Sequence, residues 1–139
     1  GVSSAASDVY KRQVKKDGGV ALMIDNPSPN NTTIERKIDL QPSTNYVFSA
    51  DVLTEGVRIT EKGGQYAVNL YAGDSTSTKD MAGTKPWTTI ALPFTSGPKT
   101  DSLPLKLAIG GFGSVASGRA FFRNVQVRKV GYPVEGTKQ

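Results

Sequence analysis

Hydrophobic and polar residues alternate with a period of two through most of the chain. The clearest case is the Leu-Pro-Leu-Lys-Leu-Ala-Ile sequence of residues 103–109, and residues 46–53, 65–71 and 89–94 follow the same pattern. Such alternation is typical of β-strands that turn one face to a core and the other to water.

Three further segments have strand character, namely Val20–Asp25, Thr32–Leu40 and Arg119–Lys129. Clusters of Gly, Pro, Asn, Ser and Thr separate the strands and predict turns at residues 26–30, 41–44, 63–64 and 73–86. No segment longer than about one turn has a helical period. At least seven short strands with frequent turns predict an all-β fold, an antiparallel β-sandwich or barrel.

The two ends of the chain lack this alternation. Residues 1–13 are small and polar, and residues 8–13 match the translation of a transposon end used in sequencing libraries. We therefore expect residues 1–13 to be either a non-native leader, from fragmented metagenome DNA, or an ordinary disordered leader. Residues 131–139 are expected to form a linker or tail, which leaves one domain at residues 14–130.

The composition narrows the chemistry. The 139 residues include no His and no Cys, which removes the commonest general base, zinc sites and disulfides. The net charge of +5 belongs to the ends, since residues 1–16 carry +3, residues 119–139 carry +4 and the middle carries −2. No nucleic-acid-binding module and no apolar run of membrane-spanning length is present, so we expect neither partner.

Several motifs give the segment from about Lys16 to Val130 a family resemblance. They are Asp17-Gly18, residues 45–52 (Asn-Tyr-Val-Phe-Ser-Ala-Asp-Val), residues 83–89 (Gly-Thr-Lys-Pro-Trp-Thr-Thr) and residues 118–125 (Gly-Arg-Ala-Phe-Phe-Arg-Asn-Val). In their order and spacing they resemble carbohydrate-binding modules of the β-jelly-roll, galactose-binding-like type, such as families 4, 16 and 22. The resemblance implies a jelly-roll sandwich, here expected to be a monomer, appended to a secreted polysaccharide-degrading enzyme.

Modules of this type commonly bind glycans on the outward face of one sheet. The polar phase of the alternating strands supplies six candidate ligand-binding residues: Ser49, Asp51, Gln65, Asn69, Tyr71 and Lys106. Tyr71 offers a stacking ring, Asn69 offers an amide, and Lys106 suits an acidic or decorated glycan better than a neutral one. The alternative interpretation is that these residues form the solvated face of a sheet.

The resemblance also implies two structural features. Trp87 is expected to cap one end of the core, with its N–H reaching a loop carbonyl, and the alternative is a platform for a sugar ring. A structural calcium is implied between the N-terminal segment, the Asp17-Gly18 turn and Asn124, but Arg123 stands where an acidic residue would be usual. Asn124 is therefore either a calcium ligand or a hydrogen-bonded residue at the edge of the core.

No motif singles out catalytic residues, and the acidic residues fall mainly in turns. We therefore expect a non-catalytic, extracellular module that holds a parent catalytic domain of the same chain near its polysaccharide or oligosaccharide. The alternative is a structural spacer or domain-docking sandwich that binds no glycan. The Gly110–Gly113 sequence (Gly-Gly-Phe-Gly) is expected to end a strand where bulky side chains would obstruct a turn or an approaching ligand.

Overall fold

The structure, a computed structural model, describes residues 10–60, 65–77, 81–100 and 102–131 as an all-β domain. No helix occurs among these residues, and so none that could cross a membrane. The strands are β1 (Tyr10–Lys16), β2 (Gly19–Asn30), β3 (Thr32–Asp39), β4 (Asn45–Ile59), β5 (Val68–Ala72), β6 (Ser75–Thr76), β7 (Gly83–Thr95), β8 (Ser102–Ile109) and β9 (Ala116–Lys129).

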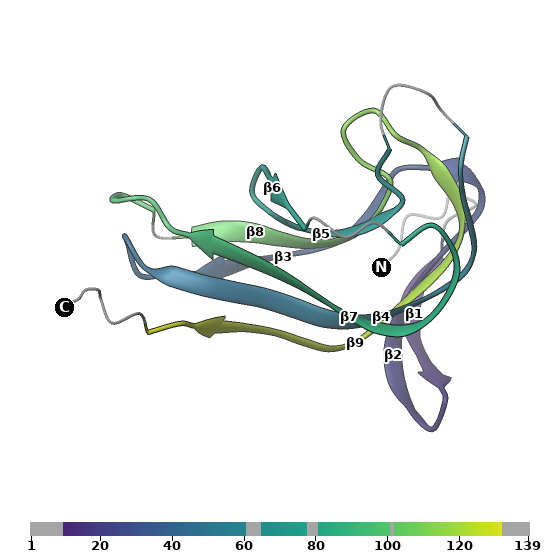
Figure 1. The fold of residues 1–139 in the computed structure, drawn as a ribbon, viewed down its shortest axis with the longest axis horizontal. Coiled ribbons are helices and arrows are strands. Elements are labelled where there is room, and N and C mark those ends of the chain that lie inside the picture. Colours follow the sequence, from purple (N-terminus) through teal and green to yellow (C-terminus); the bar gives the residue numbers. More distant parts are fainter. Residues whose placement is uncertain (1–9, 61–64, 78–80, 101, 132–139) are drawn as a thin grey trace.

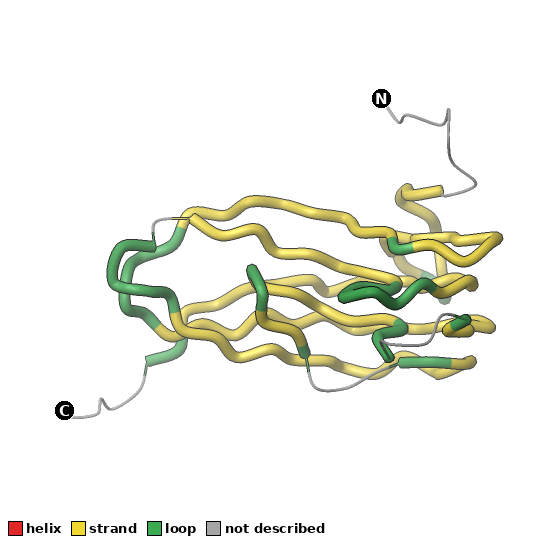
Figure 2. The backbone as a smooth tube through the Cα atoms, turned by 90° about the horizontal axis from the view of Figure 1, so that it is seen from above, coloured by secondary structure: helices red, strands yellow, loops and turns green. Residues whose placement is uncertain are grey.

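The strands form two antiparallel sheets that pack face to face (Figure 1). Sheet A has the order β1-β2-β9-β4-β7, and sheet B has the order β3-β8-β5-β6. Both are elongated along the strand direction (Figure 2). The predicted all-β jelly-roll sandwich is confirmed.

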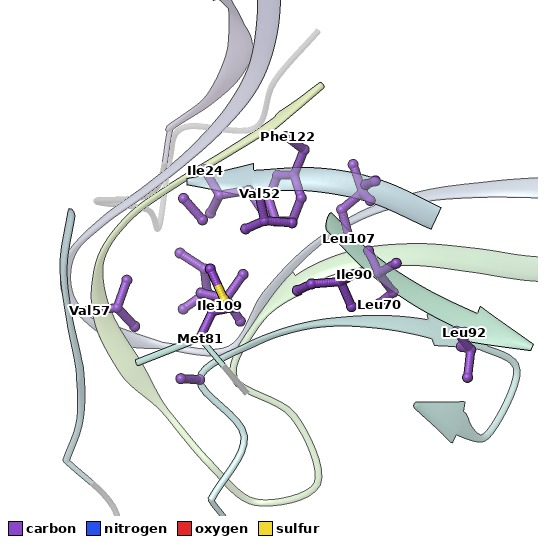
Figure 3. Close-up of a cluster of buried hydrophobic side chains, with 14 of the residues drawn as sticks. Ile24, Val52, Val57, Leu70, Met81, Ile90, Leu92, Leu107, Ile109 and Phe122 are labelled. Atoms are coloured by element: carbon purple, nitrogen blue, oxygen red, sulfur yellow. The ribbon is translucent and has the colours of Figure 1, made fainter. Parts of the chain in front are cut away.

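The core between the sheets comes from the inward phase of the alternating strands. Val52 on β4 lies opposite Phe122 on β9, and Leu70 on β5 lies opposite Leu107 on β8. These four side chains are buried in one cluster, shown in Figure 3, together with Ile24. Because the period of two sends neighbouring residues to opposite faces, the same strands carry a polar phase on the outside of the sandwich.

A second, smaller cluster lies on the outer face of sheet A. It contains Ala21, Met23 and Phe121, with Val14, Leu53 and Trp87 packed against them. The β1–β2 hairpin, which projects below sheet A in Figure 1, supplies three of these residues. Its turn, Asp17-Gly18, has φ values of 52° and 83°, the positive values that a type I′ hairpin requires.

The structure corrects several predicted boundaries. Residues 10–13, assigned to a leader, are the first half of β1, and residues 1–9 lie outside the described residues. Strand β2 runs through the predicted turn at residues 26–30, and β7 already begins at Gly83. Pairing with a neighbouring strand, which local turn residues do not reveal, extends these elements. Of the predicted tail only Gly131 is described.

Candidate glycan-binding site

The six predicted binding residues do not share one face. Asn69, Tyr71 and Lys106 belong to the outer face of sheet B, where Tyr71 on β5 lies directly opposite Lys106 on β8. Ser49 and Asp51 lie on β4 in the outward phase of sheet A, on the other side of the sandwich. The prediction that these residues form a single cleft is therefore wrong. Strands of both sheets alternate in the same way, so the alternation does not show which sheet a strand joins.

Asn69 and Tyr71 are also more deeply buried than an outward phase predicts. These residues are 1% and 5% exposed, because Ser77 contacts Asn69 and the loop after β8 contacts Tyr71. The Asn69 Oδ1 accepts a hydrogen bond of 2.8 Å from the Ser77 hydroxyl, just after β6. Asn69 is thus inaccessible to a ligand, and Gln65 lies exposed in the segment that precedes β5.

Tyr71 and Lys106 border a hollow of about 140 Å³ on the outer face of sheet B. We call it the Phe112 hollow. It is lined by residues of β3, β5 and β8, of the link between β2 and β3, and of the turns that follow β5 and β8: Asn31, Thr33, Tyr71, Gly73, Asp74, Lys106, Gly110, Gly111 and Phe112. Tyr71 is fixed there by a hydrogen bond of 3.1 Å from its hydroxyl to the Gly110 carbonyl.

Three aromatic rings meet at one end of the hollow. The Phe112 ring centroid lies 5.2 Å from that of Tyr66 and 5.4 Å from that of Tyr71, both in tilted arrangements. The alternation of residues 65–71 predicts that Tyr66 faces the core, but β5 begins only at Val68, so the strand does not include Tyr66. Phe112 is 54% exposed and offers ring surface to solvent.

The loop after β8 holds Phe112 in this position through an unusual backbone. Four consecutive residues have positive φ: Gly110 (84°), Gly111 (133°), Phe112 (50°) and Gly113 (88°). Backbone hydrogen bonds between Gly111 and Ser114 close the turn. A phenylalanine with positive φ is strained, and such residues concentrate at functional sites. The Gly-Phe-Gly motif was the signal in the sequence that could have identified Phe112 as a site residue.

The outer face of sheet A carries polar contacts at the predicted residues. The Asp51 Oδ1 accepts a hydrogen bond of 2.6 Å from the Thr89 hydroxyl on β7. Trp87 is partly buried, and its Nε1–H donates to the Asp17 carboxylate at 2.8 Å. Trp87 therefore has the predicted capping role, but on the outer cluster of sheet A rather than at the end of the main core.

Among the described residues this arrangement does not fit the calcium ion that the resemblance implies, and residues 1–9 of the N-terminal segment lie outside them. The Arg123 guanidinium lies 3.8 Å from the centre of the Trp87 ring, next to the tryptophan that binds Asp17. Asn124 is exposed, with a φ of 52°. No group of three or more acidic, His or Cys side chains converges in the described parts of the chain. Calcium takes six to eight oxygen ligands, whereas a cation and a tryptophan N–H occupy this position.

No model of a known protein family matches the chain, and no curated protein matches it. Among the solved structures that share its fold are three with carbohydrate-binding modules. A CBM4 structure has a TM-score of 0.61 and 15% identity over 91% of this chain and 81% of its own. The CBM22-1–GH10 modules of xylanase 10B from Clostridium thermocellum, solved with xylohexaose, have a TM-score of 0.59 and 19% identity over 94% of this chain and 26% of theirs.

The third structure, a family 16 carbohydrate-binding module, has a TM-score of 0.52 and 16% identity, covering 91% of this chain and 89% of its own. The chain therefore has the two-sheet jelly-roll fold of carbohydrate-binding modules, as the motifs indicated. At these identities the similarity shows the fold, and the binding site has to be argued from this chain's own residues.

Proposed function

We propose that this domain is a non-catalytic carbohydrate-binding module whose ligand occupies the Phe112 hollow. The observation that carries the proposal is the exposed Phe112 ring, held by a strained turn beside a hollow with a polar rim. A sugar ring presents a C–H face that packs on an aromatic side chain and hydroxyls that need polar partners. The Phe112 hollow offers both.

The size of the hollow limits what it can hold. Its volume of about 140 Å³ is smaller than that of sites for drug-sized ligands, which span roughly 300–1,000 Å³. It suits one sugar ring of a polymer, with the rest of the glycan in solvent. Few contacts of this kind give an affinity on the order of micromolar to millimolar.

The charges around the hollow bear on the class of glycan. Lys106 suggested an acidic ligand, but its Nζ lies 4.0 Å from the Glu35 carboxylate, and Asp74 also lines the hollow. The two carboxylates outweigh the single lysine in formal charge, so these three groups together do not favour a uronic or sulfated sugar. We therefore propose a neutral glycan and retain the acidic one as the second candidate, favoured by Lys106.

A site of this kind would serve to target an enzyme. One of the similar structures is joined to a GH10 module, and the others are binding modules with the same fold. We propose that this domain likewise keeps a catalytic domain of its parent chain near a polysaccharide outside the cell. The gain is a higher effective concentration and involves no chemistry in the module.

The test is retention of the isolated domain on neutral, uronic and sulfated polysaccharides in affinity electrophoresis, followed by titration with the best oligosaccharide. A phenylalanine exposes roughly 200 Å², so the 54% exposed Phe112 ring has about 50 Å² on the one face that a sugar would cover. At about 25 cal/mol per Å² this contact is worth about 1.2 kcal/mol, so Phe112→Ala should weaken binding roughly eightfold.

The matched control is Asp51→Ala, which alters the opposite face and should bind as the parent domain does. Loss of binding in Asp51→Ala with full binding in Phe112→Ala would move the site to sheet A. No retention on any polysaccharide would favour the alternative of a spacer or docking domain.

A further inference from the structure

Strand β9 has a neighbour on both sides for only half of its length. Strand β2 pairs with β9 from Ala116 as far as Phe122, where Leu22 is the last partner. From Arg123 to Lys129, β4 is the only described strand that pairs with β9, and this pairing ends where Lys129 lies opposite Tyr46. Within the part of the chain that the structure describes, residues 123–129 therefore form a sheet edge with no neighbouring strand on one side, which is the template for an added strand.

A bulge makes this edge different from the first half of β9. Between Arg123 and Gln126 the pairing with β4 shifts by one residue, and Asn124 has a φ of 52°. The bulge turns Val125 and Val127 towards the space between the sheets. Val125 is nevertheless 41% exposed, since no described strand lies beside it on that side.

Next to this edge, a groove of about 400 Å³ opens between the two sheets. Its other wall is β3, which pairs only with β8 and forms the edge of sheet B. Most of the lining is apolar and comes from five strands: Leu22, Ile34, Ile38, Phe48, Leu105, Leu107, Val125 and Val127, with Glu35, Arg36 and Gln126 at the rim. We call it the β3–β9 groove.

The charges along the β9 edge are positive, since residues 123–129 include Arg123, Arg128 and Lys129 and no Asp or Glu. Arg36 is exposed and makes no ion pair within the described part of the chain, and the same holds for Arg128 on β9. The one acidic residue of the lining, Glu35, already faces Lys106 at 4.0 Å. Two copies of this edge paired antiparallel about Gln126 would place Arg123 opposite Lys129, which opposes self-association.

We propose that the β3–β9 groove binds an extended segment of a partner polypeptide, which adds to β9 as a strand along residues 123–129. The segment has apolar side chains at every second position, which enter between the sheets beside Val125 and Val127. It has acidic side chains at the intervening positions, which lie on the outer face of sheet A beside Arg128. Backbone pairing supplies affinity, and the groove and the charges along the β9 edge supply specificity.

The test uses two synthetic heptapeptides of alternating residues, one of Val and Glu and one of Val and Lys. Each is titrated into the ¹⁵N-labelled domain while amide shifts and hydrogen exchange are followed. We expect saturable shifts and slower exchange of residues 123–129 with the Glu peptide, and at least tenfold weaker binding of the Lys peptide. Arg128→Glu should narrow or reverse this difference in affinity between the two peptides, which a purely apolar contact would not do.

Val125→Asp should abolish binding, whereas Val20→Asp should not, because the 59% exposed Val20 lies on the β1–β2 hairpin. Dispersed amide spectra of both variants establish that they fold. No shift with either peptide, or shifts outside β3 and β9, would overturn the proposal. So would a concentration-dependent dimer that protects residues 123–129, which would make a second copy the occupant. None of these results bears on glycan binding at the Phe112 hollow.

Discussion

Gly111 is the position where the loop that carries Phe112 is most sensitive to a single added carbon. A Cβ atom there would overlap the Tyr71 hydroxyl and lie 2.9 Å from Cζ of the same ring. Gly111 also has a φ of 133°, in a region that L-residues rarely adopt. Gly111→Ala must therefore both strain the backbone and displace Tyr71 from the Gly110 carbonyl.

The loss of stability in Gly111→Ala is the sum of the backbone strain and the lost hydrogen bond of Tyr71. The unfavourable backbone conformation costs about 1–3 kcal/mol, and the loss of the buried hydrogen bond adds about 0.5–1.5 kcal/mol. We expect Gly111→Ala to lower the free energy of unfolding by roughly 2–4 kcal/mol, which for a domain of this size lowers Tm by roughly 6–20 °C. Urea unfolding followed by Trp fluorescence and a thermal scan by circular dichroism measure both quantities.

Gly113 supplies the matched control. It has a φ of 88°, but nothing lies within 4 Å of a Cβ built there. Gly113→Ala should therefore carry the conformational cost alone. Tyr71→Phe removes the hydroxyl group that the methyl group of Gly111→Ala would overlap. The loss of stability in the double variant should therefore be about 1 kcal/mol smaller than the sum of the losses in the two single variants. Equal stabilities of the two glycine variants, or strictly additive effects, would refute the overlap argument.

Three further predictions concern stability and are measured by urea unfolding. Asn26→Ala should cost about 2–4 kcal/mol, because Asn26 is fully buried and its Oδ1 accepts from the Thr32 hydroxyl at 3.0 Å; a loss below about 1 kcal/mol would contradict this. Trp87→Phe should lower the free energy of unfolding by about 1 kcal/mol, because it removes the hydrogen bond to Asp17. Adding Asp17→Ala to the Trp87→Phe variant should lower it little further. Phe122→Ala, at the centre of the core, should cost about 3–5 kcal/mol, and a smaller loss would indicate that the sheets close over the cavity.

Much of the fold could be predicted from the alternation of side chains. The segment 103–109 shows why: its leucines enter the core and Lys106 lies outside, because a half-buried strand has no other arrangement. The strands that were missed, β1 and β6, lack such a pattern and are short or lie at the edge of a sheet. Their existence depends on pairing with β2 and β5, which local sequence does not encode.

The candidate site was less predictable. Tyr71 and Lys106 were found because they lie in the polar phase, and they do meet across β5 and β8. Asn69 has the same phase but is covered by Ser77, and Asp51 has the same phase but belongs to the other sheet. Phe112 was passed over as a binding residue because it lies in a turn, where no alternation indicates which way a side chain points.

By itself, then, the sequence determined that this protein is a β-sandwich with a jelly-roll resemblance, and which side chains of each strand leave its core. These properties depend on the period of the chain and on local turn chemistry, so they can be read from neighbouring residues. Only the tertiary structure decided which polar faces share a sheet, where Phe112 meets Tyr71, and that β9 keeps a free edge beside an apolar groove. Those features arise from contacts between segments far apart in the chain, and from bulges that reverse the alternation partway along a strand.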